Sequence, residues 1–205
     1  RAGSGALESE AARRLAYVQA HVGELAHARD LALRALELAG TPKQRALSEI
    51  AQAVVAVLAD RFEPALQHLE NAMEYLMDVP RAEARGVLAN AHLVRGRTWR
   101  LLGRPRRALA ALTRASSMAR RAGERRLEIE ALARSGQLLL EIQRVREAEE
   151  RLREALLAAR EIEDRRGEAL ARSSWASFWP NRRIPRPMRR SRSPSALRMR
   201  PGWRA

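Results

Sequence analysis

Alanines recur along this chain in pairs seven residues apart, a spacing that places both members on one face of a helix, two turns apart. The pairs are Ala28 and Ala35, Ala65 and Ala72, Ala108 and Ala115, and Ala148 and Ala155. From pair to pair the steps are 37, 43 and 40 residues, in the range of stacked helix hairpins. Small side chains that return at such a step mark close crossings of helix backbones. The pattern therefore predicts an array of helical repeats.

Other positions of the period repeat in the same register. Twelve residues before each first alanine stands another small residue: Ala16, Ala53, Gly96 and Gly136. Five residues before it stands Gly23, Asp60, Gly103 or Gln143, of which the first three tolerate a tight turn. Pro64 and Pro105 fall where second helices should begin, a position at which the missing N–H costs nothing. Each unit is predicted to be a helix, a tight turn and a second helix.

The repeat pattern covers residues 6–175 and leaves a different kind of segment behind it. The expected units are 9–40, 46–79, 89–123, 129–164 and a partial fifth at 168–175. The sextet of residues 130–135 reappears unchanged at 168–173, which indicates that a fifth unit begins. After that the pattern stops.

The segment 176–205 holds nine arginines, five prolines and no acidic residue, a composition that predicts a disordered tail. Three interpretations of the tail are open. It could bind nucleic acid or an anionic membrane through its charge. It could be a linker. It could also be an out-of-frame extension, because acidic residues are lost abruptly inside a half-built repeat and the use of Arg in place of Lys indicates a G+C-rich gene.

The small residues resemble the eighth, twentieth and twenty-seventh positions of the tetratricopeptide repeat. The third unit resembles that repeat best, through Gly96, Trp99, Gly103, Ala108, Leu112 and Ala115. The resemblance implies an all-α solenoid, a right-handed superhelix of antiparallel helix pairs with four repeats and a partial fifth. The unit length and the charged linkers look like bacterial arrays attached to signalling kinases or transcriptional regulators.

The resemblance also implies that a partner binds on the concave face formed by the first helices. The residues expected to contact it are Leu47, Ile50, Val54, Val57, Asn90, Leu93, Arg97, Arg100 and Gln137. An apolar strip beside arginines favours a peptide or amphipathic helix with an acidic flank. The alternative is that these side chains are buried between neighbouring units.

The net charge of +15 divides into +6 for residues 1–175 and +9 for the tail. Overall basicity is therefore a poor reason to assign nucleic-acid binding to the array. Residues 95–126 hold eleven arginines and one acid, whereas residues 141–154 hold five glutamates and four arginines. Either these two regions attract each other, or the basic one is a docking patch for an acidic partner.

Candidate chemistry is sparse. The chain has no cysteine, its histidines are scattered, and no phosphate-binding or nucleophile motif occurs. We expect no catalytic, cofactor-binding or metal-binding residues. The absence of cysteine leaves the compartment open, with the cytoplasm as the default. No apolar run is long enough to span a bilayer. Since the chain begins at Arg1, we expect that residues before it have been lost from a longer protein.

The sequence thus predicts a protein-interaction module, either an adaptor or the sensory arm of a larger bacterial signalling protein. Two alternatives are open. The chain could act on nucleic acid through its basic tail, or it could be a fragment of a kinase or ATPase regulator whose catalytic domain is absent.

Overall fold

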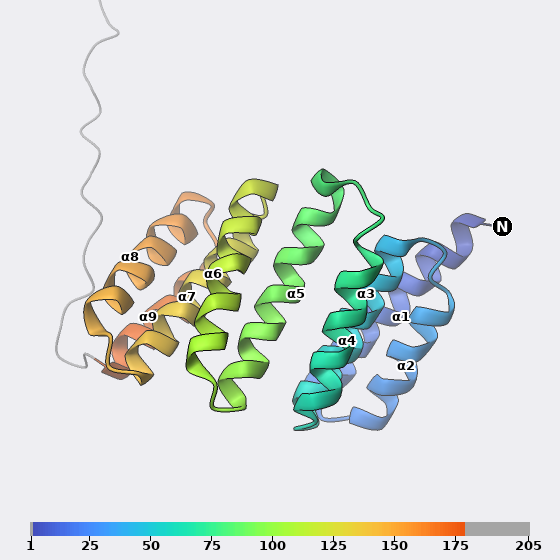
Figure 1. Cartoon of the computed structure of the whole chain (residues 1–205), viewed down its shortest axis with the longest axis horizontal. Coiled ribbons are helices and arrows are strands. Elements are labelled where there is room, and N and C mark those ends of the chain that lie inside the picture. Colours follow the sequence, from blue (N-terminus) through green and yellow to red (C-terminus); the bar gives the residue numbers. More distant parts are fainter. Residues whose placement is uncertain (1, 179–205) are drawn as a thin grey trace, which may run out of the picture.

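The computed structural model describes the backbone of residues 2–178 and the side chains of residues 5–176, so most of the predicted tail lies outside the described residues. This part of the chain is entirely helical apart from short connections (Figure 1). Its helices are α1 (Ala2–Val22), α2 (Leu25–Glu37), α3 (Pro42–Leu58), α4 (Phe62–Tyr75), α5 (Arg81–Leu101), α6 (Pro105–Ala122), α7 (Arg125–Glu141), α8 (Val145–Glu161) and α9 (Arg165–Phe178). The predicted all-α class is confirmed.

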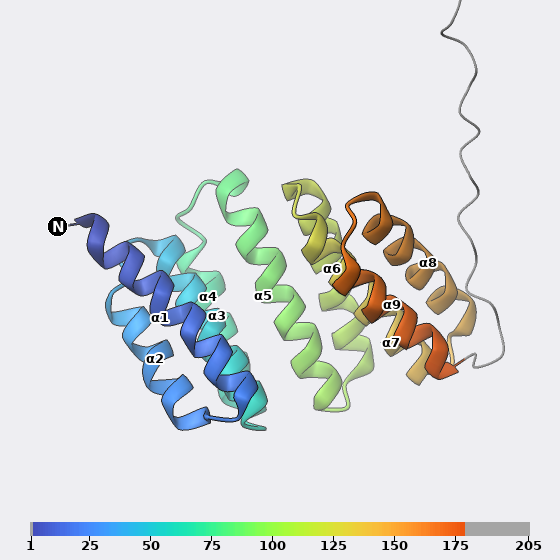
Figure 2. The ribbon, with the colours of Figure 1, turned by 180° about the vertical axis from the view of Figure 1, so that it is seen from behind.

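The helices pack as successive antiparallel pairs, with α9 as the first helix of an incomplete fifth pair. Each helix packs against the next one along the chain, and each first helix also contacts the first helix of the neighbouring unit. Within the described residues, the backbones of second helices of successive units stay apart, and Arg120 of α6 reaches Glu154 of α8 through its side chain. The first helices α1, α5 and α9 face the viewer in Figure 2, where α1 and α9 mark the two ends of the array. This is a solenoid in which contacts are made only between neighbours.

The recurring small residues are the points of closest approach between the paired helices. All eight alanines of the four pairs are fully buried. A Cβ atom added to Gly96 would lie 2.6 Å from Cγ of Leu112, and one added to Gly136 would lie 2.6 Å from Cγ of Leu152. Any side chain at either glycine would therefore force the two helices of its unit apart.

The predicted turns have the backbone conformation that the sequence pattern requires. Gly23, Asp60, Gly103 and Gln143 have φ values of 100°, 55°, 66° and 62°. The left-handed region favours glycine, yet Gln143 adopts it as well, because the turn is set by the two helices that it joins. The one copy without a turn-tolerant residue thus keeps the turn.

Helix starts also follow the sequence. Thr41 caps α3 by accepting a hydrogen bond from the backbone N–H of Gln44 at 3.2 Å, while the Gln44 side chain accepts from the Thr41 N–H. This reciprocal capping box satisfies two otherwise unpaired donors. Pro105 is the first residue of α6, and Pro64 lies within the first turn of α4.

The repeated sextet does not mark equivalent positions. The pair Arg160–Glu168 between α8 and α9 has the same geometry as the pair Arg120–Glu128 between α6 and α7. Glu168 is therefore the equivalent of Glu128, at a step of 40 residues, and not of Glu130 at the sequence step of 38. Packing sets the register here, and the identical sextets are offset from it by two residues.

Candidate functional site

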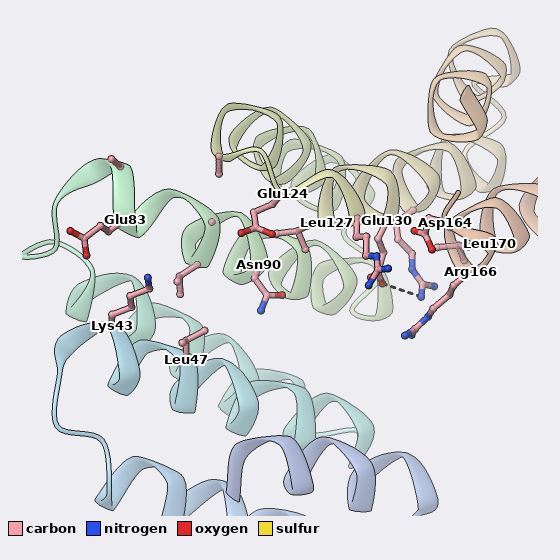
Figure 3. A pocket seen from close by; sticks show the side chains of 17 residues that line it. Lys43, Leu47, Glu83, Asn90, Glu124, Leu127, Glu130, Asp164, Arg166 and Leu170 are labelled. Atoms are coloured by element: carbon pink, nitrogen blue, oxygen red, sulfur yellow. Dashed lines mark ion pairs between the residues drawn. The ribbon is translucent and has the colours of Figure 1, made fainter. Parts of the chain in front are cut away.

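A groove of about 1030 Å³ runs across the first helices of units two to five (Figure 3). We call it the central groove. Its lining residues are Lys43, Leu47, Ala82, Glu83, Gly86, Val87, Asn90, Ala122, Glu124, Arg126, Leu127, Glu130, Arg134, Asp164, Arg166, Gly167 and Leu170. Because α3, α5, α7 and α9 each contribute to it, the groove depends on how successive units stack.

One register position contributes a basic row to the central groove. Lys43, Gly86, Arg126 and Arg166 follow one another at steps of 43, 40 and 40 residues, the steps of the repeat itself. Three of the four positions are cationic, and the fourth has no side chain. The repeat thus presents positive charge at the same height on α3, α7 and α9.

A second register position, one helical turn further along each helix, forms the central row. It consists of Leu47, Asn90, Glu130 and Leu170, which lie across the close-up view from one end of the groove to the other. Leucines stand at both ends and polar side chains between them. The amide of Asn90 can both donate and accept hydrogen bonds, as recognition of a polypeptide backbone requires.

Acidic side chains balance the basic ones along the groove as a whole. Four of the lining residues are basic and four are acidic, namely Glu83, Glu124, Glu130 and Asp164. Glu124 immediately precedes α7 and Asp164 immediately precedes α9, where a carboxylate is favoured by the helix dipole. A uniformly basic surface, as nucleic-acid backbones require, is not what this groove presents.

Positive charge is concentrated around Arg97 of α5. Burial, followed by the nearby guanidiniums of Arg134, Arg100 and Arg166, lowers the pKa of Arg97, and Glu130 offsets part of this effect. Within the described residues Arg97 has no ion-pair partner. Arg134 pairs with Glu130 at 3.5 Å, and Arg100 pairs with Glu141 at 2.7 Å. We call these four arginines the arginine cluster.

The arginine cluster has unused hydrogen-bonding capacity. Nε of Arg134 is buried without a hydrogen-bond partner among the described residues. A guanidinium carries five N–H donors in a fork that matches a carboxylate or a phosphate. Four guanidiniums beside two carboxylates leave an excess of positive charge, so the cluster can hold an anionic group.

Two solved structures resemble the helix arrangement of this chain. The aspartyl phosphate phosphatase F from Bacillus subtilis matches with a TM-score of 0.73 at 11% identity over 84% of this chain. This chain spans 45% of the length of that phosphatase. A Podospora anserina protein described as a kinesin light chain with nearly identical TPR-like repeats matches with a TM-score of 0.63 at 14% identity, covering 83% of this chain and 85% of its own. No protein-family model matches the sequence, and the comparison with curated proteins gives no match.

The fold is that of tetratricopeptide-like repeats. The predicted resemblance is thereby confirmed at the level of structure. At such low identity the likeness fixes how the helices stack in this TPR-like array and leaves its ligand open.

The TPR-like stacking divides the sequence-predicted contact residues into two groups. Leu47 and Asn90 line the central groove, while Arg97, Arg100 and Gln137 are half-buried. The other four are core residues: Ile50, Val54, Val57 and Leu93 are 0%, 7%, 6% and 4% exposed. Their burial agrees with the alternative of packing between units and removes them from the surface available to a partner. Each of the internal first helices α3, α5 and α7 lies against four neighbouring helices, so only a narrow strip of it faces the groove.

Sequence reasoning missed all four basic side chains that line the groove. Lys43, Arg126, Arg134 and Arg166 all line it. The signal was present in the register, because Lys43 and Arg126 stand four residues before Leu47 and Glu130. Lys43 is also the only lysine of the chain.

The two oppositely charged segments of the sequence attract each other. Arg100 pairs with Glu141 across units, Arg120 contacts both Glu128 and Glu154, and Arg125 pairs with Glu161 at 2.7 Å. Three arginines of the basic segment 95–126 are thus paired with carboxylates of the fourth unit. This supports the first of the two interpretations of the charge pattern.

Among the residues that the structure describes, no group of three His, Cys, Asp or Glu side chains could hold a metal ion. Burial, with help from Arg114 and Arg95, lowers the pKa of His92 to about 4, so this imidazole is neutral at pH 7. No helix in residues 2–178 is long and apolar enough to cross a membrane.

Proposed function

We propose that this chain is a non-catalytic protein-interaction module whose central groove binds a peptide or helix that carries acidic side chains. The observation that supports this most strongly is the pair of rows, basic and central, that the repeat register aligns across four first helices. A continuous row is what a linear ligand needs. A compact catalytic site would instead gather its groups at one point.

The dimensions of the groove fit a short segment. Packed helices lie about 8–10 Å apart, so four successive first helices span roughly 24–30 Å. An extended segment of about eight residues covers that distance at ~3.3 Å per residue. A helix would need about 18 residues at ~1.5 Å each. The ligand is therefore a segment and not a single side chain.

The chemistry of the rows indicates the composition of that segment. Lys43, Arg126 and Arg166 attract carboxylates at three points. Leu47 and Leu170 offer apolar contact at the two ends of the central row. An acidic residue of the segment seated at the arginine cluster would neutralise Arg97, which lacks an ion-pair partner within the described residues. Affinity should then fall with added salt, because the rim charges are screened.

A peptide-display selection against the full chain tests this proposal. Selected peptides should be enriched in Asp and Glu beside apolar residues. The double variant Arg126→Glu, Arg166→Glu should weaken their binding at least about tenfold, as loss of charge pairs at an interface does. Binding is measured by fluorescence anisotropy at two salt concentrations.

The matched control is Arg106→Glu with Arg146→Glu. Both arginines are exposed, lie outside the central groove and change the net charge by the same amount. Equal loss of binding in the two double variants would show that only net charge matters and would contradict a groove site. So would a selection that yields no acidic peptides.

The place of the module in a larger system is part of the same proposal. We propose a cytoplasmic adaptor or the regulatory arm of a bacterial signalling protein, because interaction modules of this fold act by bringing partners together. The basic segment 176–205 supports a second candidate, nucleic-acid binding outside the array, through its charge of +9. Deleting residues 179–205 separates the two functions, since salt-sensitive DNA binding would be lost while acidic-peptide binding stayed.

A further inference from the structure

Large apolar side chains are exposed along one face of α1. Leu7, Leu15, Val18 and Val22 are 70%, 44%, 57% and 72% exposed. With the exposed Ala11 they follow one another at spacings of four, four, three and four residues, which is one stripe of a helix. We call these five residues the α1 stripe. It lies on the helix that forms the N-terminal end of the array (Figure 2).

The repeat register shows what this face does elsewhere in the protein. The equivalents of Ala11 are Ser48, Ala91, Ala131 and Ala171, and all four are 0% exposed. The equivalents of Val18 are Val55, Thr98 and Leu138, which are 5%, 0% and 2% exposed. At these two positions the face is thus buried in the later first helices and exposed in α1.

In the later units the second helix of the preceding unit covers this face. Val55 of α3 packs in one cluster with Ala28 and Ala32 of α2. Ala131 and Leu138 of α7 pack in one cluster with residues of α6, namely Ala108, Leu112 and Ala115. The face is therefore an established interface between units, repeated along the array.

The α1 stripe has the composition of a helix face that another helix covers. Ala11 keeps the small side chain that all its equivalents share at the point of close approach, and the other positions are large aliphatics. End units of solenoids usually carry a polar outer face. The free face of α9, at the opposite end, follows that rule more closely, with Arg172 and Ser173 at its exposed positions. The N-terminal end of the array therefore exposes an apolar helix face, whereas the exposed face of α9 is more polar.

We propose that the α1 stripe is the docking face for the second helix of a further repeat unit that precedes α1 in the same polypeptide. The covering helix has the chemistry of α6: an alanine pair seven residues apart on an amphipathic helix. The register places that helix before α1, because in every later unit the covering helix belongs to the preceding unit. This inference is independent of the central groove, which α1 does not line.

The first test supplies such a helix from the protein itself. Residues 105–124, which form α6 and the turn after it, are placed directly before Gly5, the register equivalent of Arg125. We expect the melting temperature of the chain to rise by at least about 2 °C, the smallest shift that a stabilisation of ~1 kcal/mol gives in a domain of this size. Amide exchange in α1 should slow at the same time.

Two matched variants make the test specific. In the first, the added helix carries Glu in place of its copies of Leu112 and Ala115, and no rise is expected. In the second, Leu15→Glu and Val18→Glu are made on the α1 stripe. They should leave the unextended chain folded, because both side chains are exposed, and abolish the rise in the extended chain. His27→Glu, on the exposed side of α2, should leave the rise intact.

Three results would overturn the proposal. The first is an equal rise with the native and the Glu-bearing added helix. The second is a dimer in sedimentation velocity that Leu15→Glu and Val18→Glu dissolve, since a second copy would then cover the stripe. The third is an in-frame stop codon directly upstream of Arg1 in the gene. An upstream reading frame that encodes an alanine pair with its second member about ten residues before Gly5 would support it, as Ala115 stands before Arg125.

Discussion

The junction between α4 and α5 and the junction between α6 and α7 hold the same two kinds of helix together by different means. At the second junction, Arg120 of α6 pairs with the buried Glu128 of α7 at 2.6 Å, and the pair recurs between α8 and α9. At the first junction, the equivalents of Arg120 and Glu128 are Met77 and Leu88. Leu76 and Val79 there pack with Leu88 in one apolar cluster.

The two junctions also differ in the number of residues that connect their helices. From Ala72 to Gly96 the chain has three residues more than from Ala115 to Gly136. The extra residues lie between Tyr75 and Arg81, where α4 ends and α5 begins. The comparison shows that helix stacking fixes the register in this protein, and that either apolar contacts or ion pairs can fill the space which the stacking leaves.

The largest effect is expected in the apolar cluster that α3, α4 and α5 share. Ile50→Asp places an unpaired carboxylate at a fully buried position and should destabilise the protein by at least about 4 kcal/mol. Leu47→Asp, one turn away in the central groove, should cost ~1 kcal/mol or less. Urea unfolding followed by circular dichroism measures both. A folded Ile50→Asp protein that merely loses partner binding would contradict the burial described here.

One repeat position is occupied by Glu49, His92 and Leu132 in units two, three and four. Because these side chains differ in charge, the effect of pH on stability should differ between units. The pKa of His92 is lowered to about 4 by burial and two arginines, against 6.5 in an unfolded chain. Below pH 6.5 the unfolded state therefore binds a proton that the native state does not, so stability is lost as the pH falls toward 4. At pH 4.5 the loss relative to neutral pH should be about 2–3 kcal/mol.

His92→Leu, which copies the residue of the next unit, should remove this part of the pH dependence. Urea unfolding at pH 7.5 and pH 4.5 measures it. His27→Gln, at an exposed position, is the control and should leave the pH dependence unchanged. An equal pH dependence in wild type and His92→Leu would show that His92 is not the titrating group.

The ion-paired junction can be tested on its own carboxylates. Glu128→Gln weakens two charged hydrogen bonds, from Arg120 at 2.6 Å and from Arg125 at 2.9 Å, and should destabilise by ~2 kcal/mol. Glu168→Gln weakens the equivalent pair with Arg160, and a pair with Arg172, at a more exposed place and should cost ~0.5 kcal/mol. Thermal unfolding compares the two variants at equal salt. Equal losses would mean that burial of Glu128 adds nothing to the pair.

The smallest expected effect concerns two equivalent turns, one with Gln143 and one with Gly103. Gln143→Gly should stabilise the protein by ~0.5–1 kcal/mol, because φ at this position is 62° and glycine adopts it without strain. Gly103→Ala, at the equivalent turn, should destabilise by about as much. Melting temperatures of the two variants should shift in opposite directions. Shifts of the same sign would show that the turn conformation does not control stability.

The fold was predictable because small residues report directly on helix crossings. Gly96 and Gly136 are needed where Leu112 and Leu152 approach, so their spacing carried the register. The groove was predictable only in part. Leu47 and Ile50 are three residues apart on one helix, and which of them faces a neighbour depends on the angle at which units stack. That angle depends on the packing of all the units, so the sequence of a single helix does not determine it.

Among the described residues, each helix contacts only the two helices that follow it and the two that precede it along the chain. A growing polypeptide can therefore complete each pair as soon as it leaves the ribosome, without waiting for distant segments. Because contacting residues lie close together in the sequence, folding can begin at any unit and spread to its neighbour. Loss of a terminal unit should shorten this protein rather than unfold it.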